Sequence, residues 1–269
     1  MAALARKILD KAPLLQGPAY LAWVVSMGTK NAMLRFMFKN FGRVANSNSD
    51  RGQDRWVIDD VFKGKTDGFF VELGAADGFN DSNTFVLEKR FGWEGLCIEP
   101  NPVFFDKLTS LAKRDCTLVQ LGVDAKNGSA EFLLDGQRSG LTYDDTSNSE
   151  AARGISLEKA KDEGRVAVIE TVTLGEVFDR YNAPKVIDYF SFDVEGAETR
   201  ILREFPFDRY TFLAMTIERP TPELNELLFK NGYHFVKNSL YDTFYVHESL
   251  PNFDEIERDP FEQLPAKKF

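Results

Sequence analysis

The alternation of short apolar runs with amphipathic segments constrains the fold of this 269-residue chain more than any other feature. Apolar runs of about four to eight residues, bounded by Gly, Pro or polar residues, are typical of buried strands. Five such runs are expected to form core strands: residues 69–76, 95–100, 117–123, 186–194 and 211–217. A closing antiparallel pair is expected at residues 233–236 and 243–246.

Helical segments are expected between these runs, where apolar residues recur at helical spacing. They span residues 83–91, with Ser82 as a cap, and residues 104–111, 199–204 and 223–231. Residues 128–134 and 166–174 are candidates for extra strands or a β-arm. This rhythm predicts an α/β, Rossmann-like protein with a mostly parallel seven-stranded sheet and helices on both faces.

The chain is long enough for one substantial domain, expected at residues 46–250, followed by an irregular tail at residues 251–269. Residues 135–165 interrupt the rhythm, because they are rich in Asp, Ser, Gly and Glu and carry few large apolar side chains. We expect them to form a long surface excursion, either a mobile loop or a lid over the substrate pocket.

The first 45 residues form a separate basic segment, with seven Lys or Arg and one acid in a chain of net charge −9. The apolar stretch at residues 19–27 is too short to cross a bilayer. Two roles stay open for residues 1–45: helices that pad the domain or form a homodimer contact, which we favour, and amphipathic helices at a membrane surface. The expected location is the cytoplasm, with peripheral membrane contact as the second option.

The composition argues against several classes of function. The net acidic charge disfavours general nucleic-acid binding, because neutralising phosphates requires an excess of Lys and Arg. Cys97 and Cys116 lie in or beside apolar runs and are expected to be buried thiols. The sequence contains two histidines, His234 and His247, which disfavours His-rich metal sites and Ser-His-Asp triads. A general base is therefore expected to be a carboxylate.

Ligands of open α/β sheets bind beyond the carboxyl ends of the strands, so the residues that follow each strand decide the function. After the first strand, Gly74 and Gly78 let the backbone approach a ligand closely, while Glu72 and Asp77 suit a cation. The turn lacks the G-x-G-x-x-G spacing of a dinucleotide site. S-adenosylmethionine, which carries a sulfonium and an ammonium, fits this turn better than a pyrophosphate does.

Single acids follow the second and third strands. Glu99 is placed to accept hydrogen bonds from both hydroxyls of a ribose, with Pro100 beside it. The alternative for Glu99 is a carboxylate at the start of the next helix. Asp124 could reach the amino group of an adenine, or it could be an ordinary turn residue ahead of Asn127.

More acids follow the fourth and fifth strands. Asp193 and Glu195 are two residues apart, so they share a face of an extended strand, and Glu218 belongs to the same rim. Such acids can take a proton from a hydroxyl or hold a sulfonium. The trio could also bind Mg²⁺, with Asp193 and Glu218 as the first candidates. Alternatively, Glu195 and Glu198 cap the helix that follows.

Several motifs occur in order along the chain: Val71-Glu-Leu-Gly-Ala-Ala-Asp-Gly, Ser82-Asn-Thr, Gly92-Trp-Glu-Gly-Leu-Cys-Ile-Glu-Pro-Asn-Pro and Phe192-Asp-Val-Glu-Gly-Ala-Glu. Together they resemble the FkbM-type methyltransferase family. The resemblance covers residues 51–246 and takes in Gln53 and Asp54. It implies a class I methyltransferase fold and O-methylation, often of a sugar hydroxyl in a glycan or of a natural product. Ala76 departs from the general methyltransferase pattern, in which Gly is often found.

The resemblance also implies roles for single residues. Those that would line the methionine end of the cofactor are Glu72, Gly74, Ala75, Asp77 and Gly78, with Ser82 and Asn83 beside them. Glu99 would hold the ribose, while Asp193 and Glu195 would face the site of transfer to a sugar or small-molecule hydroxyl. Asp193 is the expected general base or hydroxyl orienter. The rivals are an NAD- or nucleotide-dependent enzyme and a non-catalytic module that binds the same cofactor.

Overall fold

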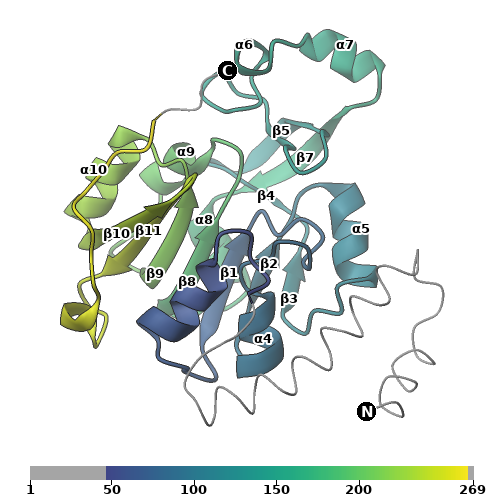
Figure 1. Ribbon diagram of the computed structural model, residues 1–269. Coiled ribbons are helices and arrows are strands. Elements are labelled where there is room, and N and C mark those ends of the chain that lie inside the picture. The colour runs from purple at the N-terminus through teal and green to yellow at the C-terminus, as the bar shows by residue number, and fades with distance from the viewer. Residues whose placement is uncertain (1–46, 266–269) are drawn as a thin grey trace, which may run out of the picture.

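A twisted sheet of seven strands forms the centre of the protein, in the order β10-β11-β9-β8-β1-β2-β3 (Figure 1). The computed structural model describes residues 47–265. The strands are β1 (Phe69–Leu73), β2 (Glu94–Ile98), β3 (Thr117–Val119), β8 (Val186–Phe192), β9 (Thr211–Glu218), β10 (Tyr233–Ser239) and β11 (Asp242–His247). β11 is antiparallel to both neighbours, whereas β1, β2, β3, β8 and β9 run parallel. The predicted mostly parallel, Rossmann-like sheet is confirmed.

Helices cover both faces of this sheet (Figure 1). The helical elements are α3 (Gln53–Arg55), η1 (Trp56–Val61), α4 (Phe85–Phe91), α5 (Pro102–Ser110), α6 (Glu150–Arg153), α7 (Leu157–Asp162), α8 (Leu174–Arg180), α9 (Glu198–Arg203), α10 (Pro222–Lys230) and η2 (Phe253–Glu255). Phe70 of β1 shares one core cluster with Trp56 and Leu87, while the adjacent Val71 shares the other with Leu202. Because alternate side chains point to opposite faces, β1 is buried on both sides.

A second, smaller sheet is built by the chain between β3 and β8, in the order β4-β7-β5-β6. Its strands are β4 (Gly122–Val123), β5 (Gly128–Leu133), β6 (Gly140–Leu141) and β7 (Val166–Val172). The expectation of one strand over residues 117–123 is wrong, because Gly122 and Val123 pair with β7 and not with β2. Gly122 packs closely against β7, since a Cβ at this position would lie 2.6 Å from the Ile169 side chain and 3.2 Å from that of Thr171.

Residues 135–165 contain regular structure besides β6. The short helices α6 and α7 project away from the main sheet (Figure 1). Ser149 and Ser156 cap these helices, because each side chain accepts a backbone N–H of the first turn. Residues 146–149 are buried, and the N–H of Ser147 donates to the carbonyl of Glu195 at 3.0 Å. The segment therefore packs beside the turn that follows β8 before it reaches the surface.

The two ends of the chain differ in how much is described. Up to residue 265, the predicted tail holds only the short turn η2, and Gln263 anchors it through a hydrogen bond from Asn225 at 2.8 Å. The basic segment at residues 1–45 lies outside the described residues. Within residues 47–265, no helix combines the length and apolar character needed to span a bilayer.

Candidate active site

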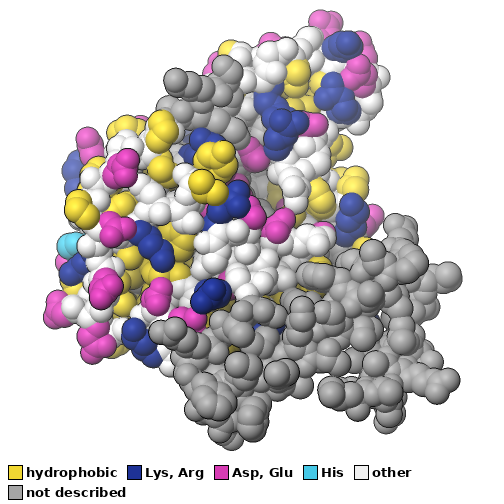
Figure 2. Space-filling model, viewed as in Figure 1, with side chains coloured by type: hydrophobic (Ala, Val, Ile, Leu, Met, Phe, Trp, Pro, Cys, Tyr) yellow, Lys and Arg dark blue, Asp and Glu magenta, His cyan; other side chains and the backbone are white. Residues whose placement is uncertain are grey.

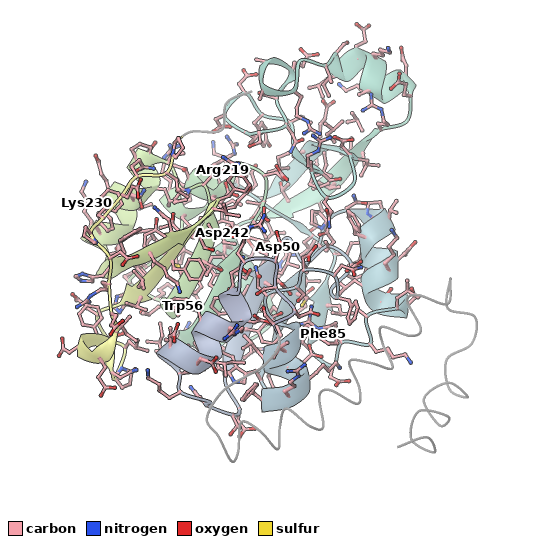
Figure 3. All side chains as sticks on the ribbon, viewed as in Figure 1. Asp50, Trp56, Phe85, Arg219, Lys230 and Asp242 are labelled. Atoms are coloured by element: carbon pink, nitrogen blue, oxygen red, sulfur yellow. The ribbon has the colours of Figure 1, made fainter. Side chains whose placement is uncertain are left out.

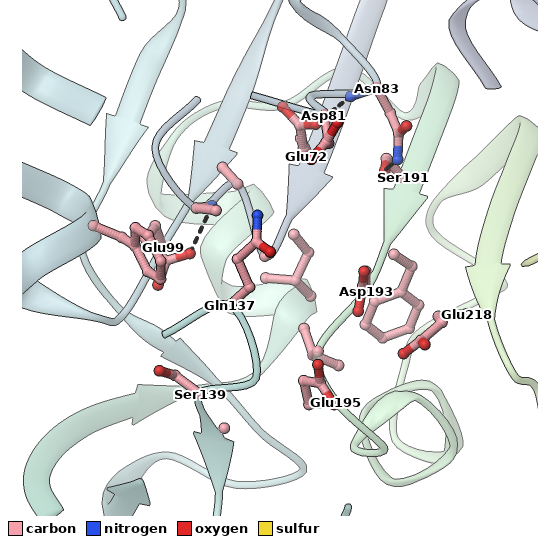
Figure 4. A pocket seen from close by; sticks show the side chains of 18 of the residues that line it. Glu72, Asp81, Asn83, Glu99, Gln137, Ser139, Ser191, Asp193, Glu195 and Glu218 are labelled. Carbon is pink, nitrogen blue, oxygen red and sulfur yellow. Dashed lines mark hydrogen bonds between the residues drawn. The ribbon is translucent and has the colours of Figure 1, made fainter. Parts of the chain in front are cut away.

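A cavity of about 330 Å³ opens where β1, β2, β8 and β9 end (Figure 4). Its walls combine the carboxyl ends of these parallel strands with residues 136–141, which belong to the chain of the second sheet. The predicted site residues that line the cavity are Glu72, Gly74, Ala75, Ser82, Asn83, Glu99, Pro100, Asp193, Glu195 and Glu218. Segments far apart in the sequence thus meet at one edge of the sheet, as expected for an open α/β fold.

The turn after β1 packs directly on the turn after β8. Gly74 has φ +87°, and a Cβ at this position would lie 1.8 Å from the carbonyl oxygen of Asp193. The N–H of Asp193 donates to the carbonyl of Leu73 at 3.1 Å, so the two turns are joined on both sides. A glycine is therefore required at residue 74 to bring the first turn and the acid of β8 together.

Glu72 is held by the protein on nearly every side, with 4% of its surface exposed. Its carboxylate accepts hydrogen bonds from the Ser82 hydroxyl at 2.9 Å, the Thr84 hydroxyl at 2.7 Å and the backbone N–H of Asn83 at 2.8 Å. Arg114 lies 3.4 Å away as an ion-pair partner. Glu72 therefore shapes the segment at residues 82–84, and its oxygens are largely occupied.

Asn83 offers a polar atom that the protein leaves without a partner. Its side-chain nitrogen donates to the Ser191 hydroxyl at 2.8 Å, and Figure 4 shows these two side chains next to each other on one side of the cavity. Its carboxamide oxygen is buried and has no hydrogen-bond partner among the described residues. A buried acceptor of this kind costs free energy unless a ligand or water supplies a donor.

Glu99 lies across the cavity from Asp193 (Figure 4). Its two carboxylate oxygens accept the backbone N–H groups of Ala76 at 2.8 Å and Asn101 at 2.7 Å. Burial raises the pKa of Glu99 to about 7, although both hydrogen bonds act in the opposite direction. The carboxylate is thus fixed in place and close to the balance between its charged and neutral forms at neutral pH.

Asp193 begins the turn after β8, and its side chain is open to the cavity. Enclosure by the surrounding protein raises the pKa of Asp193 well above its usual range, and the negative charges of Glu218 and Glu195 raise it further. Perturbed carboxyl groups that line a cavity are typical of acid–base sites. The predicted grouping of Asp193, Glu195 and Glu218 at one rim is therefore matched by their shared cavity.

Glu198, at the start of α9, closes the turn that carries Glu195. Its carboxylate accepts the backbone N–H groups of Val194 at 3.0 Å and Gly196 at 3.4 Å. Burial raises the pKa of Glu198 to about 8. The alternative that Glu195 or Glu198 caps this helix is wrong: the N-cap is Ala197, no side chain caps the helix, and Glu198 bonds instead to the turn that precedes it.

Three carboxylates come close enough together to hold a metal ion. The nearest oxygens of Asp193, Glu198 and Glu218 all lie within 4.8 Å of one another. The predicted trio contained Glu195, whereas the structure brings Glu198 close to Asp193 and Glu218. Oxygen clusters of this kind suit Mg²⁺, but exposed acids often gather without an ion, so a metal at this site stays a prediction.

The family of this chain follows from comparison with known sequences. The Methyltransferase FkbM domain matches residues 72–235, more than half of the chain. The chain belongs to the FkbM methyltransferase family. The matched segment begins at Glu72 and contains Glu99 and Asp193, so it spans both sides of the cavity. No curated protein matches the sequence.

Solved structures similar to this FkbM chain are methyltransferases and related enzymes of low sequence identity. Precorrin-6y C5,15-methyltransferase from Geobacter metallireducens GS-15 has 11% identity and a TM-score of 0.35, over 68% of this chain and 80% of its own. The METTL16 MTase domain has 10% identity and a TM-score of 0.38, over 81% and 78%. MtNAS, solved in complex with MTA and tNA, has 8% identity and a TM-score of 0.35, over 90% and 68%. The fold of the FkbM chain is the Rossmann-like class I methyltransferase fold.

One wall of the cavity was not predicted from the sequence. Asp242 begins β11, lies opposite Glu218 in the strand register and accepts a hydrogen bond from the Gln53 side chain at 2.8 Å. Burial raises the pKa of Asp242 to about 7, and the charge of Glu218 adds to this effect. Figure 3 shows Asp50, Arg219 and Asp242 gathered at this end of the sheet. Only Gln53 was marked beforehand, as part of the segment noted ahead of the first strand.

Three predicted cofactor residues do not line the cavity of the FkbM chain. Asp77 closes its own turn, accepting the backbone N–H groups of Phe79 at 3.0 Å and Asn80 at 2.8 Å. Gly78 faces the interior, because a Cβ there would lie 2.1 Å from the Leu108 side chain. The third residue, Asp124, is buried and paired with Arg200 at 2.5 Å. The carboxylate of Asp124 is thus paired with the guanidinium of Arg200 in this structure.

Proposed function

We propose that this FkbM chain transfers a methyl group from S-adenosylmethionine to a hydroxyl of a sugar in a glycan or glycosylated natural product. The observation that carries the proposal is the position of Asp193. It adjoins the Gly74 turn on one side and interacts with the charges of Glu218 and Asp242 on the other. A carboxylate between a donor turn and a polar acceptor wall is placed to receive the proton that a hydroxyl releases.

The donor side fits a methyl donor that carries an ammonium and a ribose. Asn83 offers the unpartnered carboxamide oxygen, which would accept a hydrogen bond from the ammonium of the donor. Glu99 offers a carboxylate that two backbone N–H groups hold in place. This carboxylate would accept hydrogen bonds from the ribose hydroxyls. When bound, S-adenosylmethionine supplies the electrophilic methyl group. The acids around the cavity favour this cationic donor over a pyrophosphate-bearing nucleotide, whose phosphates they would repel.

In this proposal Asp193 first orients the acceptor hydroxyl and then receives its proton as the oxygen takes the methyl group. The new C–O bond forms as the S–CH₃ bond of the donor breaks, and its electron pair stays on sulfur. The products are a methyl ether, the neutral thioether S-adenosylhomocysteine and a protonated carboxyl. A carboxyl group with a raised pKa is the stronger base once it is ionised, and a cation in the neighbouring donor site would favour the ionised form.

The acceptor wall supports a small polar acceptor. The wall comprises two carboxylates, one amide, one guanidinium and one aromatic ring: Asp50, Arg51, Gln53, Tyr241 and Asp242. Such groups can pair with several hydroxyls at once. On the face shown in Figure 2, basic side chains of the described residues are interspersed with acidic ones, unlike the continuous basic surface that binds nucleic acid.

The test of this function is transfer of a labelled methyl group. The protein is incubated with labelled donor and with surface-glycan extracts, free sugars and glycosides, and the label is then located by linkage analysis. An O-methyl sugar is the expected product. Label on nitrogen or carbon would replace O-methylation by another methyl transfer. Binding of the donor without transfer to any acceptor would favour a non-catalytic module.

The affinity for a ribose should depend on pH through Glu99. Ribose hydroxyls donate to the carboxylate and lower its pKa from about 7, so binding releases a proton and weakens as the pH falls through 7. Adenosine, which has the ribose but lacks the methionine part and its ammonium, should bind about tenfold more weakly at pH 6 than at pH 8. Calorimetric titration checks this. Glu99→Gln should bind weakly with no pH dependence, whereas equal wild-type affinities at both pH values would rule out this role.

A further inference from the structure

Arg114 is a charged residue that the catalytic proposal does not use. It lies between α5 and β3, and its side chain is 0% exposed. It does not line the cavity. A guanidinium removed from water is stable only when its donors are met by good acceptors, so the partners of Arg114 indicate its role.

Among the described residues, the hydrogen-bond and ion-pair partners of Arg114 all lie on the segment from β1 to α4. Its Nε donates to Glu88 at 2.7 Å. Its Nη1 donates to the carbonyl of Gly78 at 2.9 Å and to the Ser82 hydroxyl at 3.2 Å, and its Nη2 donates to the Thr84 hydroxyl at 2.8 Å. The side chain thus holds the beginning, middle and end of residues 78–88 at once, which the fork of a guanidinium can do and a single ammonium cannot.

Glu72 contacts the same segment and lies 3.4 Å from Arg114. The hydroxyls of Ser82 and Thr84 donate to Glu72 and also accept from Arg114. Between these two hydroxyls lies Asn83, whose N–H donates to Glu72. The backbone at Asn83 is therefore fixed by its own hydrogen bond to a buried anion and by the bonds of its two neighbours to a buried cation, and this fixes where the Asn83 side chain enters the cavity.

We propose that Arg114 is a positioning residue for the methyl donor: together with Glu72 it holds residues 78–84 in the shape that presents the Asn83 carboxamide to the cavity. This inference rests on the proposed donor site. It differs from a purely structural role in one respect. A structural residue would change the stability of the protein, whereas a positioning residue changes donor affinity through Asn83.

The test measures donor binding in two variants that do not touch the cavity. Thr84→Val removes a hydroxyl from the network at nearly constant volume, and Arg114→Lys keeps the charge but loses the fork. Each should raise the Kd for S-adenosylmethionine about 10- to 100-fold by calorimetry, the range expected for lost hydrogen bonds to charged groups. The matched controls are Thr171→Val, a buried strand threonine bonded to the Lys126 carbonyl, and Arg180→Lys, an exposed ion-paired arginine. Both should leave Kd within about twofold.

A double-mutant cycle shows whether the effect passes through Asn83. Asn83→Ala alone should weaken donor binding, and adding Thr84→Val to it should weaken binding little further, because the positioned group is already absent. Additive effects, or a Kd for Thr84→Val equal to the wild-type value, would overturn the inference. If Arg114→Lys does not fold, the Thr84 and Asn83 variants still decide. Failure of the wild-type protein to bind the donor would instead reject the proposed function.

Discussion

Replacing Asp193 by Asn should lower methyl transfer about 10²- to 10⁴-fold and leave the Kd for S-adenosylmethionine nearly unchanged. Asparagine keeps the size of the side chain and the backbone bond from residue 193 to Leu73, so the donor turn stays in place. What disappears is the group that takes the acceptor proton. Initial rates on the acceptor found by methyl labelling, together with calorimetric titration of the donor, measure the two quantities separately.

A matched control for this variant is Asp106→Asn, which makes the same chemical change at an exposed position of α5. It should leave both turnover and donor affinity as in the wild type. Unchanged turnover in Asp193→Asn would remove Asp193 from the mechanism and leave Glu218 or Asp242 as the carboxylate to examine. A large loss of donor affinity would instead mean that Asp193 acts mainly by holding the cofactor.

The second large effect is expected from Gly74→Ala. The added Cβ would lie 1.8 Å from the carbonyl oxygen of Asp193, and the backbone at φ +87° disfavours any side chain. Left-handed strain and overpacking against backbone together should lower the free energy of unfolding by about 2–5 kcal/mol. Because the clash can be relieved only by separating the turns after β1 and β8, donor binding should be lost in the protein that still folds.

Chemical denaturation measures the first part of this prediction, and calorimetry of the refolded variant measures the second. Gly154→Ala is the control, since Gly154 also has a left-handed backbone, at φ +61°, but a Cβ there would meet no atom within 4 Å. It should cost only the backbone strain, about 1–2 kcal/mol, and leave donor binding intact. Equal stability losses in the two variants would show that the close approach to Asp193 is unimportant.

Local patterns were enough to predict most of the main sheet. Strands buried on both faces give continuous apolar runs, so β1, β2, β8 and β9 stand out from the polar turns around them. Glu99 and Asp193 were found for the same reason, because each directly follows such a run and the ends of parallel strands converge. Cys97 and Cys116 are free thiols, as predicted, but only Cys97 is buried, and Cys116 is partly exposed.

The misassigned strand shows where local patterns fail. Residues 117–123 form one apolar run, yet the chain leaves the edge of the main sheet after Val119 and enters another sheet at Gly122. The change falls at the exposed polar residue Gln120, which lies between the end of β3 and the beginning of β4 and was read as part of a single strand. The residue that follows, Asp124, is therefore carried to a different place from the one a single strand implies.

Residues whose roles depend on distant partners were also missed. Arg114 lies in a charged stretch, Lys113-Arg-Asp, which is typical of a solvated loop. Only its contacts with residues 72–88 show that it is buried and holds that segment in place. Asp242 enters the cavity because β11 folds back beside β9. Pairings across such separations leave no local signal in one sequence.

The contact between Gly74 and Asp193 separates what can vary in this protein from what cannot. The closest approach of the donor turn to the β8 turn is made by main-chain atoms, so no exchange of side chains can lengthen or shorten it. In relatives that keep both turns, the distance between the methyl donor and the base would therefore be the same. New acceptors would then have to be accommodated by Gln53, Asp242 and residues 136–141, which come from outside the parallel strands and can change length or composition without shifting that spacing.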